Sequence, residues 1–399
     1  MKKFLTLMLM ALAVNASAQK YIRIWQEGHS VRIPAQDIVY GNGGTEITAG
    51  GVTYATNEVD SITVVKSVIV EFNGETATVD KGFASELELA IEGAHVTITN
   101  PNIWAETEFE VSGSSTNGSL TYYGDYKCKF HLNGLSLTSA VGAAFNVQCG
   151  KRIDMILTEG TNNILVDAAN GEHKAALIFK GHPEFEGSGS LTITGNTRHG
   201  IDSNEYMYFK KGLGNITINK AISDGIHTEQ YFMMEDGNLD ISGVGGDGLQ
   251  AEVSGDSTEI YNGQIFIKGG NIKIVAAADD TKAIKSDSLI TISGGTIDIT
   301  ASGAGNRGIS TDTHLVINED DATTDIYVLA SGNRYTDPVT DDTKRCTGIR
   351  VKGDLTVSAG TVTVKCSGSG SRGVRVDGKF YDYGGTVTPE PDASAVIRK

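Results

Sequence analysis

The amino-acid sequence predicts an all-β protein: a right-handed parallel β-helix preceded by a small N-terminal β module. Three observations support this prediction. A short phrase repeats at near-constant spacing, alternating strand patterns flank its copies, and no convincing helical apolar stripe follows the first residues. Glycine accounts for 49 of the 399 residues, which suits a chain with many tight turns.

The repeated phrase is a small residue followed by an apolar one. The small residue recurs after 23 to 25 residues, with longer intervals of 32, 35 and 40 residues where insertions fall. Its copies are Ala144, Ala176, Gly200, Gly225, Gly248, Ala283, Gly308, Gly348 and Gly373. A base period of about two dozen residues indicates stacked repeats.

Alternating apolar residues complete each repeat. They precede the phrase, as in residues 191–193 and 216–218, and follow it, as in 207–209 and 232–234. This period of two predicts strands with one buried face. Three short strands per repeat describe a turn of a parallel β-helix, with successive turns about 4.8 Å apart. A large antiparallel sandwich is the alternative, but it would not explain the equal intervals.

The chain divides into four segments. Residues 1–18 have the Lys2-Lys3 start, apolar run and Ala16-Ser17-Ala18 end of a secretory signal peptide. Residues 19–65 form the small β module, to which we assign no chemistry, and residues 66–388 form the β-helix. Residues 389–399 lose the pattern and are expected to be disordered. We therefore expect an exported monomer, extracellular or at the cell surface, without a membrane span.

The charge and the cysteines narrow the class of protein. A net charge of −16 argues against nucleic acid as a partner, because such a surface repels phosphates. Four cysteines fall in two pairs, Cys128 with Cys149 and Cys346 with Cys366, each separated by about one turn. Stacked residues lie within disulfide reach. Free buried thiols are an equally good interpretation.

Acidic residues recur at equivalent positions of successive repeats. If Ile201 and its equivalents point inward, then Glu229 stacks on Glu252, Asp287 on Asp312 and Asp224 on Asp247. Like charges about 5 Å apart repel, and calcium, with its oxygen ligands, would offset the repulsion. The candidate ligands are Asp202, Asp224, Glu229, Asp247, Glu252, Asp287 and Asp312. Solvation, or pairing with Lys282, Lys285 and Arg307, is the alternative.

Two further groups of residues are candidates for sugar binding. Tyr206 and Tyr231 occupy equivalent outward positions one turn apart, where aromatic rings offer a face to a pyranose. A ladder that only covers a strand edge is the alternative. Cationic residues of the later turns form the second group: Lys285, Arg350, Arg372 and Arg375. Arginine binds carboxylates bidentately, which suits a uronate polymer, although pairing with nearby aspartates explains it equally well.

Residues 160–167, 175–178, 187–193 and 199–201 together resemble a known family. The chain is similar, over residues 68–387, to secreted β-helix carbohydrate-binding domain-containing proteins, first described for a clostridial protein that binds cellulose and polygalacturonate. Their fold is similar to that of the ninth family of polysaccharide lyases. The resemblance implies calcium on the β-helix and binding of plant-type polysaccharide. Where the family has Ser-Lys-Asp-Asp-Leu, this chain has residues 203–207, Ser-Asn-Glu-Tyr-Met, so ligands do not carry over there.

These observations predict a non-catalytic protein that binds an acidic or β-linked plant-type polysaccharide on a calcium-stabilised β-helix. A calcium-dependent pectate-type lyase is one alternative, because Lys282 and Lys285 stand near Asp247 and Asp287. An adhesin or surface scaffold is another, because the fold alone does not choose among these functions. The sequence has no nucleophile motif, His/Cys metal cluster or phosphate loop that would indicate another enzyme.

Overall fold

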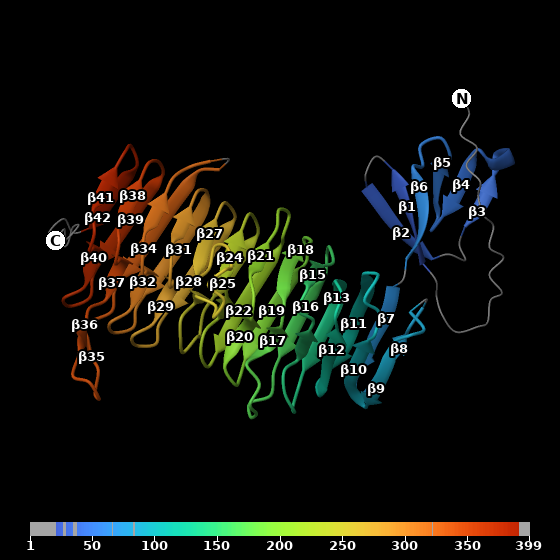
Figure 1. Ribbon diagram of the computed structural model, residues 1–399, viewed down its shortest axis with the longest axis horizontal. Helices are drawn as coiled ribbons and strands as arrows, with labels where there is room; N and C mark the ends of the chain where they lie inside the picture. Colours follow the sequence, from blue (N-terminus) through green and yellow to red (C-terminus); the bar gives the residue numbers. More distant parts are fainter. Residues whose placement is uncertain are drawn as a thin grey trace. The chain divides into compact units, whose positions relative to one another are not determined.

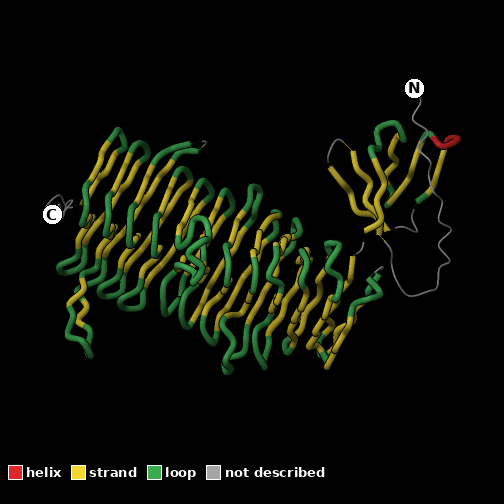
Figure 2. The backbone as a smooth tube through the Cα atoms, in the orientation of Figure 1, coloured by secondary structure: helices red, strands yellow, loops and turns green. Residues whose placement is uncertain are grey.

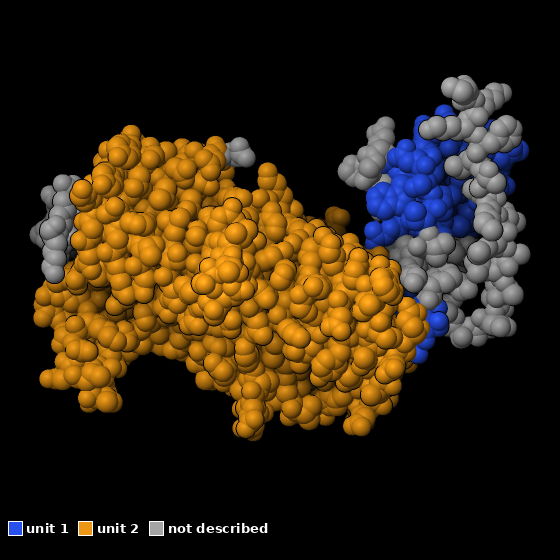
Figure 3. Space-filling model, viewed as in Figure 1, with its two compact units in different colours: residues 1–69, 79–85 blue, residues 70–78, 86–399 orange. Residues whose placement is uncertain are grey.

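The computed structural model describes residues 21–390 except 27–28, 35–37, 66, 83 and 321. The predicted signal peptide and residues 391–399 lie outside this range. The chain separates into two compact units, residues 1–69 with 79–85 and residues 70–78 with 86–399 (Figure 3). One 3₁₀ helix, Asn42–Gly44, interrupts the strands of the described residues. None of their helices has the length and apolar character needed to cross a membrane.

The smaller unit contains two antiparallel sheets, as its alternating pattern predicts. One has the order β2-β1-β6 and the other β3-β4-β5. The strands are β1 (Tyr21–Gln26), β2 (His29–Pro34), β3 (Val39–Gly41), β4 (Glu46–Ala49), β5 (Val52–Ala55) and β6 (Ser61–Val65). Ile22, Ile24, Ile33, Ile47 and Tyr54 are among the side chains that form its buried core.

The larger unit is the predicted parallel β-helix (Figures 1 and 2). Each turn contributes one strand to each of three faces. The first face contains β9 (Glu88–Glu92), β10 (Ala94–Asn100), β12 (Gly118–Gly124), β14 (Phe145–Gln148), β17 (Ala175–Phe179), β20 (His199–Ser203), β23 (Ile226–Glu229), β26 (Leu249–Glu252), β29 (Lys282–Ser286), β32 (Arg307–Thr311), β37 (Thr347–Val351) and β40 (Arg372–Val376).

The second and third faces are built in the same way. The second contains β15 (Arg152–Leu157), β18 (His182–Glu186), β21 (Met207–Phe209), β24 (Tyr231–Met234), β27 (Gln264–Ile267), β30 (Ile290–Ile292), β33 (Leu315–Ile317), β38 (Leu355–Val357) and β41 (Phe380–Asp382). The third contains β16 (Asn162–Val166), β19 (Ser190–Gly195), β22 (Asn215–Ala221), β25 (Asn238–Ile241), β28 (Asn271–Ala276), β31 (Gly295–Ala301), β34 (Thr324–Ala330), β39 (Thr361–Cys366) and β42 (Thr386–Glu390). The remaining strands are β7 (Ser67–Asn73), β8 (Thr76–Asp80), β11 (Thr107–Ser115), β13 (Cys128–Thr138), β35 (Tyr335–Thr336) and β36 (Thr343–Lys344).

The register of the first face follows the repeated phrase. Ile201 pairs with Ile226, Ile226 with Leu249, and Leu249 with Ile284, all in parallel. The glycine of the phrase is required by the close approach of the next turn. A Cβ atom on Gly225 would lie 2.6 Å from the carbonyl oxygen of Gly248. Residues two dozen apart in sequence are therefore neighbours in space, as predicted.

A ladder of aromatic rings fills the core between the faces. Phe185 meets Phe209 edge-on with ring centres 5.2 Å apart, and Phe209 meets Phe232 in the same way at 5.1 Å. All three side chains are at most 1% exposed. Burying each ring removes enough apolar surface to contribute on the order of 3 kcal/mol. The alternation that predicted these inward positions is thus confirmed.

The ends of the β-helix differ from each other. At the N-terminal end β9 pairs antiparallel with β10, which ends the parallel ladder of the first face. At the C-terminal end β42 pairs parallel with β39 and runs to Glu390. The prediction that the pattern is lost from residue 389 is therefore wrong by two residues. Pro389 fits because an edge strand tolerates a missing N–H group.

The four cysteines are thiols that come together in the predicted pairs. Cys128 and Cys149 are both fully buried and hydrogen-bonded to each other. That bond from Cys128 lowers the pKa of Cys149 to about 7. Cys366 packs against the cluster of Ala301, Ala330 and Cys346. The disulfides remain a prediction for the oxidised protein.

Candidate carbohydrate-binding surface

The outer side of the first face carries three rows of polar side chains. In the middle row Asp202, His227, Gln250, Lys285, Ser310, Arg350 and Arg375 are in register. The row runs from an acidic and histidine-containing end to an arginine-rich end. Its positions were predicted to point outward, yet Asp202 is only 1% exposed. His227 and Lys174 close over its carboxylate, at 2.8 and 3.6 Å.

A second row lies in the short loop just before each strand of the first face. Its side chains accept hydrogen bonds from the backbone of the next coil of the β-helix. Asp224 Oδ1 accepts a hydrogen bond from the N–H of Asp247 at 2.6 Å, and Asp247 Oδ1 accepts one from the N–H of Lys282 at 2.8 Å. Asp224 Oδ2 also lies 3.1 Å from His199 Nδ1. Burial works against ionisation of Asp224, but the hydrogen bond and charge of His199 outweigh it and hold its pKa below the ordinary value. Stacked carboxylates are thus stabilised by backbone donors.

Most of the predicted calcium ligands have partners within the protein. Asp202 pairs with His227, Asp224 with His199, Asp247 with Lys282, Glu252 with His227, Asp287 with Lys285 and Asp312 with Lys352. Glu229 lacks such a partner among the described residues and stacks on Glu252 as predicted. Pairing with Lys282 or Lys285, the alternative drawn from the sequence, therefore accounts for two of the seven acids, while histidines or Lys352 lie within ion-pair distance of four others.

Glu229 instead belongs to an acidic corner that the sequence did not reveal. The long loop between β26 and β27 brings Glu259 close to Glu205, which precedes β21. Burial raises the pKa of Glu205, and the charges of Glu259 and Glu229 raise it further. Such a corner needs a proton or a cation to offset repulsion. Of the predicted calcium ligands, Glu229 is the one that fits a cation here.

The predicted tyrosine pair is present but does not form a flat platform. Tyr206 and Tyr231 stack with ring centres 4.8 Å apart and planes 10° apart, and the other face of Tyr206 meets His182 at 4.7 Å. Both faces of Tyr206 are covered by other rings, so a pyranose cannot stack on Tyr206, and sugar binding at Tyr231 stays a prediction. Tyr261, which the sequence did not single out, is turned 90° from Tyr231 and is 47% exposed.

The predicted arginines converge on a pocket of about 170 Å³ at the C-terminal turns. The hairpin β35–β36 projects from the β-helix (Figure 1), and Thr343 and Lys344 of β36 with the following Arg345 line the pocket. We call this site the arginine pocket; it is lined by Arg307, Thr343, Lys344, Arg345, Thr347, Arg350, Arg372 and Arg375. The sequence did not predict Lys344 and Arg345, because the hairpin that carries them interrupts the repeat. Lys285 lies two turns away on the same row and pairs with Asp287 at 3.4 Å.

The arginine pocket holds more positive charge than its surroundings neutralise. Arg350 and Arg375 both bind Asp377, and Lys344 binds Asp280. Within the described residues no carboxylate pairs with Arg307, Arg345 or Arg372. Burial lowers the pKa of Arg372, and the neighbouring arginines, Arg345 first, lower it further. The buried Nε of Arg372 has no hydrogen-bond partner in the described structure. The pocket is therefore suited to an anion.

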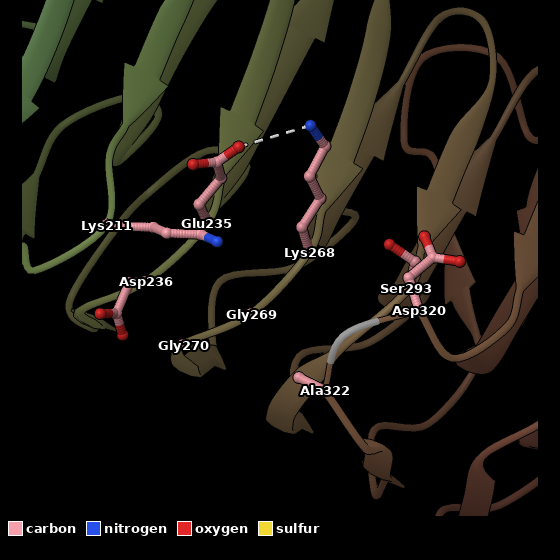
Figure 4. A pocket seen from close by; sticks show the side chains of 9 residues that line it. All are labelled: Lys211, Glu235, Asp236, Lys268, Gly269, Gly270, Ser293, Asp320 and Ala322. Carbon is pink, nitrogen blue, oxygen red and sulfur yellow. Dashed lines mark ion pairs between the residues drawn. The ribbon is translucent and has the colours of Figure 1, made fainter.

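A larger hollow of about 510 Å³ lies along the edge between the second and third faces (Figure 4). It crosses several turns, and Lys268 bridges to Glu235 at 3.5 Å on one side. Its lining consists of Lys211, Glu235, Asp236, Lys268, Gly269, Gly270, Ser293, Asp320 and Ala322. Its charges are mixed and no aromatic ring lines it, so a sugar there would have neither a stacking partner nor a dominant charge.

Parallel turns, a polar first face and an arginine-lined pocket define the chain as a β-helix protein with a cationic pocket. A family model described as carbohydrate-binding domain-containing protein matches residues 92–391. The chain belongs to this family, as the sequence resemblance predicted.

A solved structure confirms the fold. The polysaccharide lyase-like protein from C. thermocellum, determined as a gadolinium derivative, matches with a TM-score of 0.52 and 23% sequence identity. The match covers 64% of this chain and 97% of that chain. At this identity the likeness supports the β-helix and no further property. A search of curated proteins finds no match.

Proposed function

We propose that this chain binds an acidic polysaccharide, with the arginine pocket holding carboxylate groups of the polymer. The observation that carries the proposal is the meeting of Arg307, Arg345 and Arg372 without a carboxylate partner in the described residues. A bound carboxylate would relieve their repulsion and satisfy Arg372 Nε. Because the whole chain carries a net charge of −16, an acidic polymer is repelled elsewhere and held at this patch.

A polymer fits this surface better than a single sugar does. The turn that carries Tyr231 and the turn that carries Arg350 are separated by four steps of the first face, from β23 to β37. At about 4.8 Å per step, the separation is roughly 20 Å. A chain lying along the β-helix would reach both the arginine pocket and the exposed Tyr261, on which a pyranose can stack. Longer oligosaccharides should therefore bind more tightly than short ones.

Calcium is part of the proposal at the acidic corner of Glu205, Glu229 and Glu259. Burial and the charges of Glu259 and Glu229 raise the pKa of Glu205, so an oxygen-binding cation would offset the repulsion among these carboxylates. Calcium bound there would raise the melting temperature of the folded chain. A Glu205→Gln, Glu259→Gln variant should lose that rise. An equal rise in the variant and in the unchanged chain would contradict this placement.

We further propose that the protein is exported, acts as a monomer and binds without cleaving. The signal-like residues 1–18 support export. The ion pairs of Lys282 and Lys285 with aspartates support a binding role, because a lysine base must be free to take a proton. A calcium-dependent pectate-type lyase and an adhesin or surface scaffold are the competing functions.

A glycan array, read with calcium and with chelator, tests the proposal. We expect binding to uronate polymers, weakened by salt, and a loss of at least about tenfold in an Arg345→Gln, Arg372→Gln variant, because each charge-assisted bond contributes about 1.5–3 kcal/mol. A Lys220→Gln, Lys273→Gln variant of the third face has the same charge change and should bind normally.

The same samples separate the alternatives. Unsaturated, ultraviolet-absorbing ends released from polygalacturonate would indicate a lyase. Retention of a surface protein without any glycan would indicate an adhesin. Equal binding by the pocket variant and the third-face variant would reject the arginine pocket as the site.

A further inference from the structure

Three side chains with metal-binding atoms converge on the first face, away from the arginine pocket. They are His199 and Asp202 on β20 and His227 on β23, and their candidate ligand atoms all lie within 4.8 Å of one another. The two strands are adjacent and in register, with Asp202 opposite His227. The repeat aligns Asp202 with His227, but the sequence did not single out this trio as a metal site, because the approach of His199 from the neighbouring row depends on side-chain torsions.

The carboxylate of Asp202 is buried and only half satisfied. Its Oδ1 accepts a hydrogen bond from His227 Nδ1 at 2.8 Å. Its Oδ2 is buried without a hydrogen-bond partner, although the whole residue is only 1% exposed. Lys174 Nζ lies 3.6 Å from Oδ2, and it donates to Asn204 Oδ1 at 2.8 Å instead. A buried anionic oxygen without a hydrogen bond is costly, and a cation bound to Oδ2 would offset that cost.

His199 is held as a metal-bound imidazole commonly is, whereas both nitrogens of His227 face carboxylates, Nδ1 that of Asp202 at 2.8 Å and Nε2 that of Glu252 at 3.4 Å. His199 Nδ1 faces the carboxylate of Asp224 at 3.1 Å and the Asp224 N–H at 3.3 Å, which leaves Nε2 as the nitrogen available to a metal. Carboxylates in this position orient the ring of a metal-binding histidine. The ring centres of His199 and His227 are 4.7 Å apart. Their planes are 21° apart and the rings are stacked, so His227 must turn about its side-chain torsions before both rings can bind one ion in their planes.

We propose that His199, Asp202 and His227 bind a divalent transition metal ion of the zinc class. Two nitrogen donors and one carboxylate select such an ion, whereas calcium takes oxygen ligands only. The ion would bind Oδ2 of Asp202, and Lys174 would move toward solvent, since its side chain is already 44% exposed. Water or a hydroxyl group of a bound sugar completes the coordination. The site is thus independent of the arginine pocket and of the calcium proposal.

The test uses the full mature chain after treatment with chelator. We expect one Zn²⁺ ion per chain by calorimetry and, with Co²⁺ as the probe, visible absorption bands of a nitrogen- and oxygen-bound ion. His199→Gln, His227→Gln and Asp202→Asn should each weaken Zn²⁺ binding more than tenfold, and Asp224→Asn about tenfold. Lys174→Met should strengthen it, because a competing cation is removed. Circular dichroism confirms that each variant is folded.

A matched control separates a built site from general surface binding. His131→Gln removes another histidine–carboxylate pair, with Glu108 on β11 and β13, and should leave Zn²⁺ affinity unchanged. Three outcomes would overturn the proposal: no saturable Zn²⁺ binding, an equal loss in the His131 variant, or full displacement by an equal concentration of Ca²⁺. Polysaccharide binding through the arginine pocket should persist in the His199 variant, so failure of one proposal does not imply failure of the other.

Discussion

Replacing Asp224 tests whether the row of aspartates just before the first-face strands stabilises the stacking of successive coils. Asp224 Oδ1 is the acceptor for the buried N–H of Asp247, and Oδ2 faces His199 Nδ1. In Asp224→Ala the N–H of Asp247 is left unsatisfied at a cost of about 1–3 kcal/mol, and His199 loses a bond of about 1 kcal/mol. The expected loss in the free energy of unfolding is therefore about 2–4 kcal/mol.

Asp224→Asn removes the negative charge of the side chain but keeps a hydrogen-bond acceptor. The amide oxygen still accepts the bond from Asp247, while the repulsion that contributes to the raised pKa of Asp247 disappears. We expect a loss of at most about 1 kcal/mol, because a neutral bond replaces a charged one and relief of repulsion offsets part of the difference. The two variants should therefore differ by roughly 2 kcal/mol.

Urea denaturation followed by circular dichroism measures these differences. Amide exchange of residues 223–250 should also increase in Asp224→Ala, since stacked repeats open locally. Asp298→Ala, on the exposed outer side of β31, is the control and should change stability by less than about 0.5 kcal/mol. All measurements are made in chelator, which removes any contribution of bound metal. If Asp224→Ala is as stable as Asp224→Asn, the ladder does not depend on this acceptor.

Three further predictions follow from the core, the histidine pair and the thiols. Phe209→Ala should lower the free energy of unfolding by about 3–5 kcal/mol in urea, because the fully packed ring leaves a cavity between Phe185 and Phe232; a loss below about 1 kcal/mol would contradict the packing. Burial opposes protonation of His227, but its bond to Asp202 raises its pKa above 6.5. In chelator, stability should therefore be greatest below about pH 6.5 and fall as pH rises through the higher folded value, and His227→Gln should not show this fall. In the folded chain Cys149, whose pKa is lowered to about 7 by its bond to Cys128, should react with iodoacetamide at neutral pH before Cys128; mass spectrometry would contradict this if Cys128 reacted first.

Much of the candidate surface could be placed from the repeat alone. Once Gly200, Gly225 and Gly248 are aligned, the neighbours of every first-face residue follow, and the stacking of Tyr206 on Tyr231 and of Glu229 on Glu252 is confirmed. The alignment could not predict how an aromatic ring is oriented or which partner a carboxylate binds. Those depend on side-chain torsions and on partners in other rows, which no spacing encodes.

Insertions into the repeat also limited how much of the sites could be predicted from the sequence. The loop between β26 and β27 brings Glu259 and Tyr261 to the turns of Glu205 and Tyr231, and the hairpin β35–β36 brings Arg345 to Arg372. These residues have no periodic equivalents, so only the folded path of each insertion decides where they lie.

The sequence by itself determined the β-helix, its register and the rows of side chains on its first face. It did so because parallel strands with one buried side leave each residue a single orientation, and a slip of one residue would turn apolar side chains to solvent. The tertiary structure decided which rows close into sites: an arginine pocket completed by a hairpin, an acidic corner completed by a loop, and a His-Asp-His group shared by two turns. Convergence of side chains depends on distances across rows and on the burial that surrounds them, and both exist only once the turns are stacked.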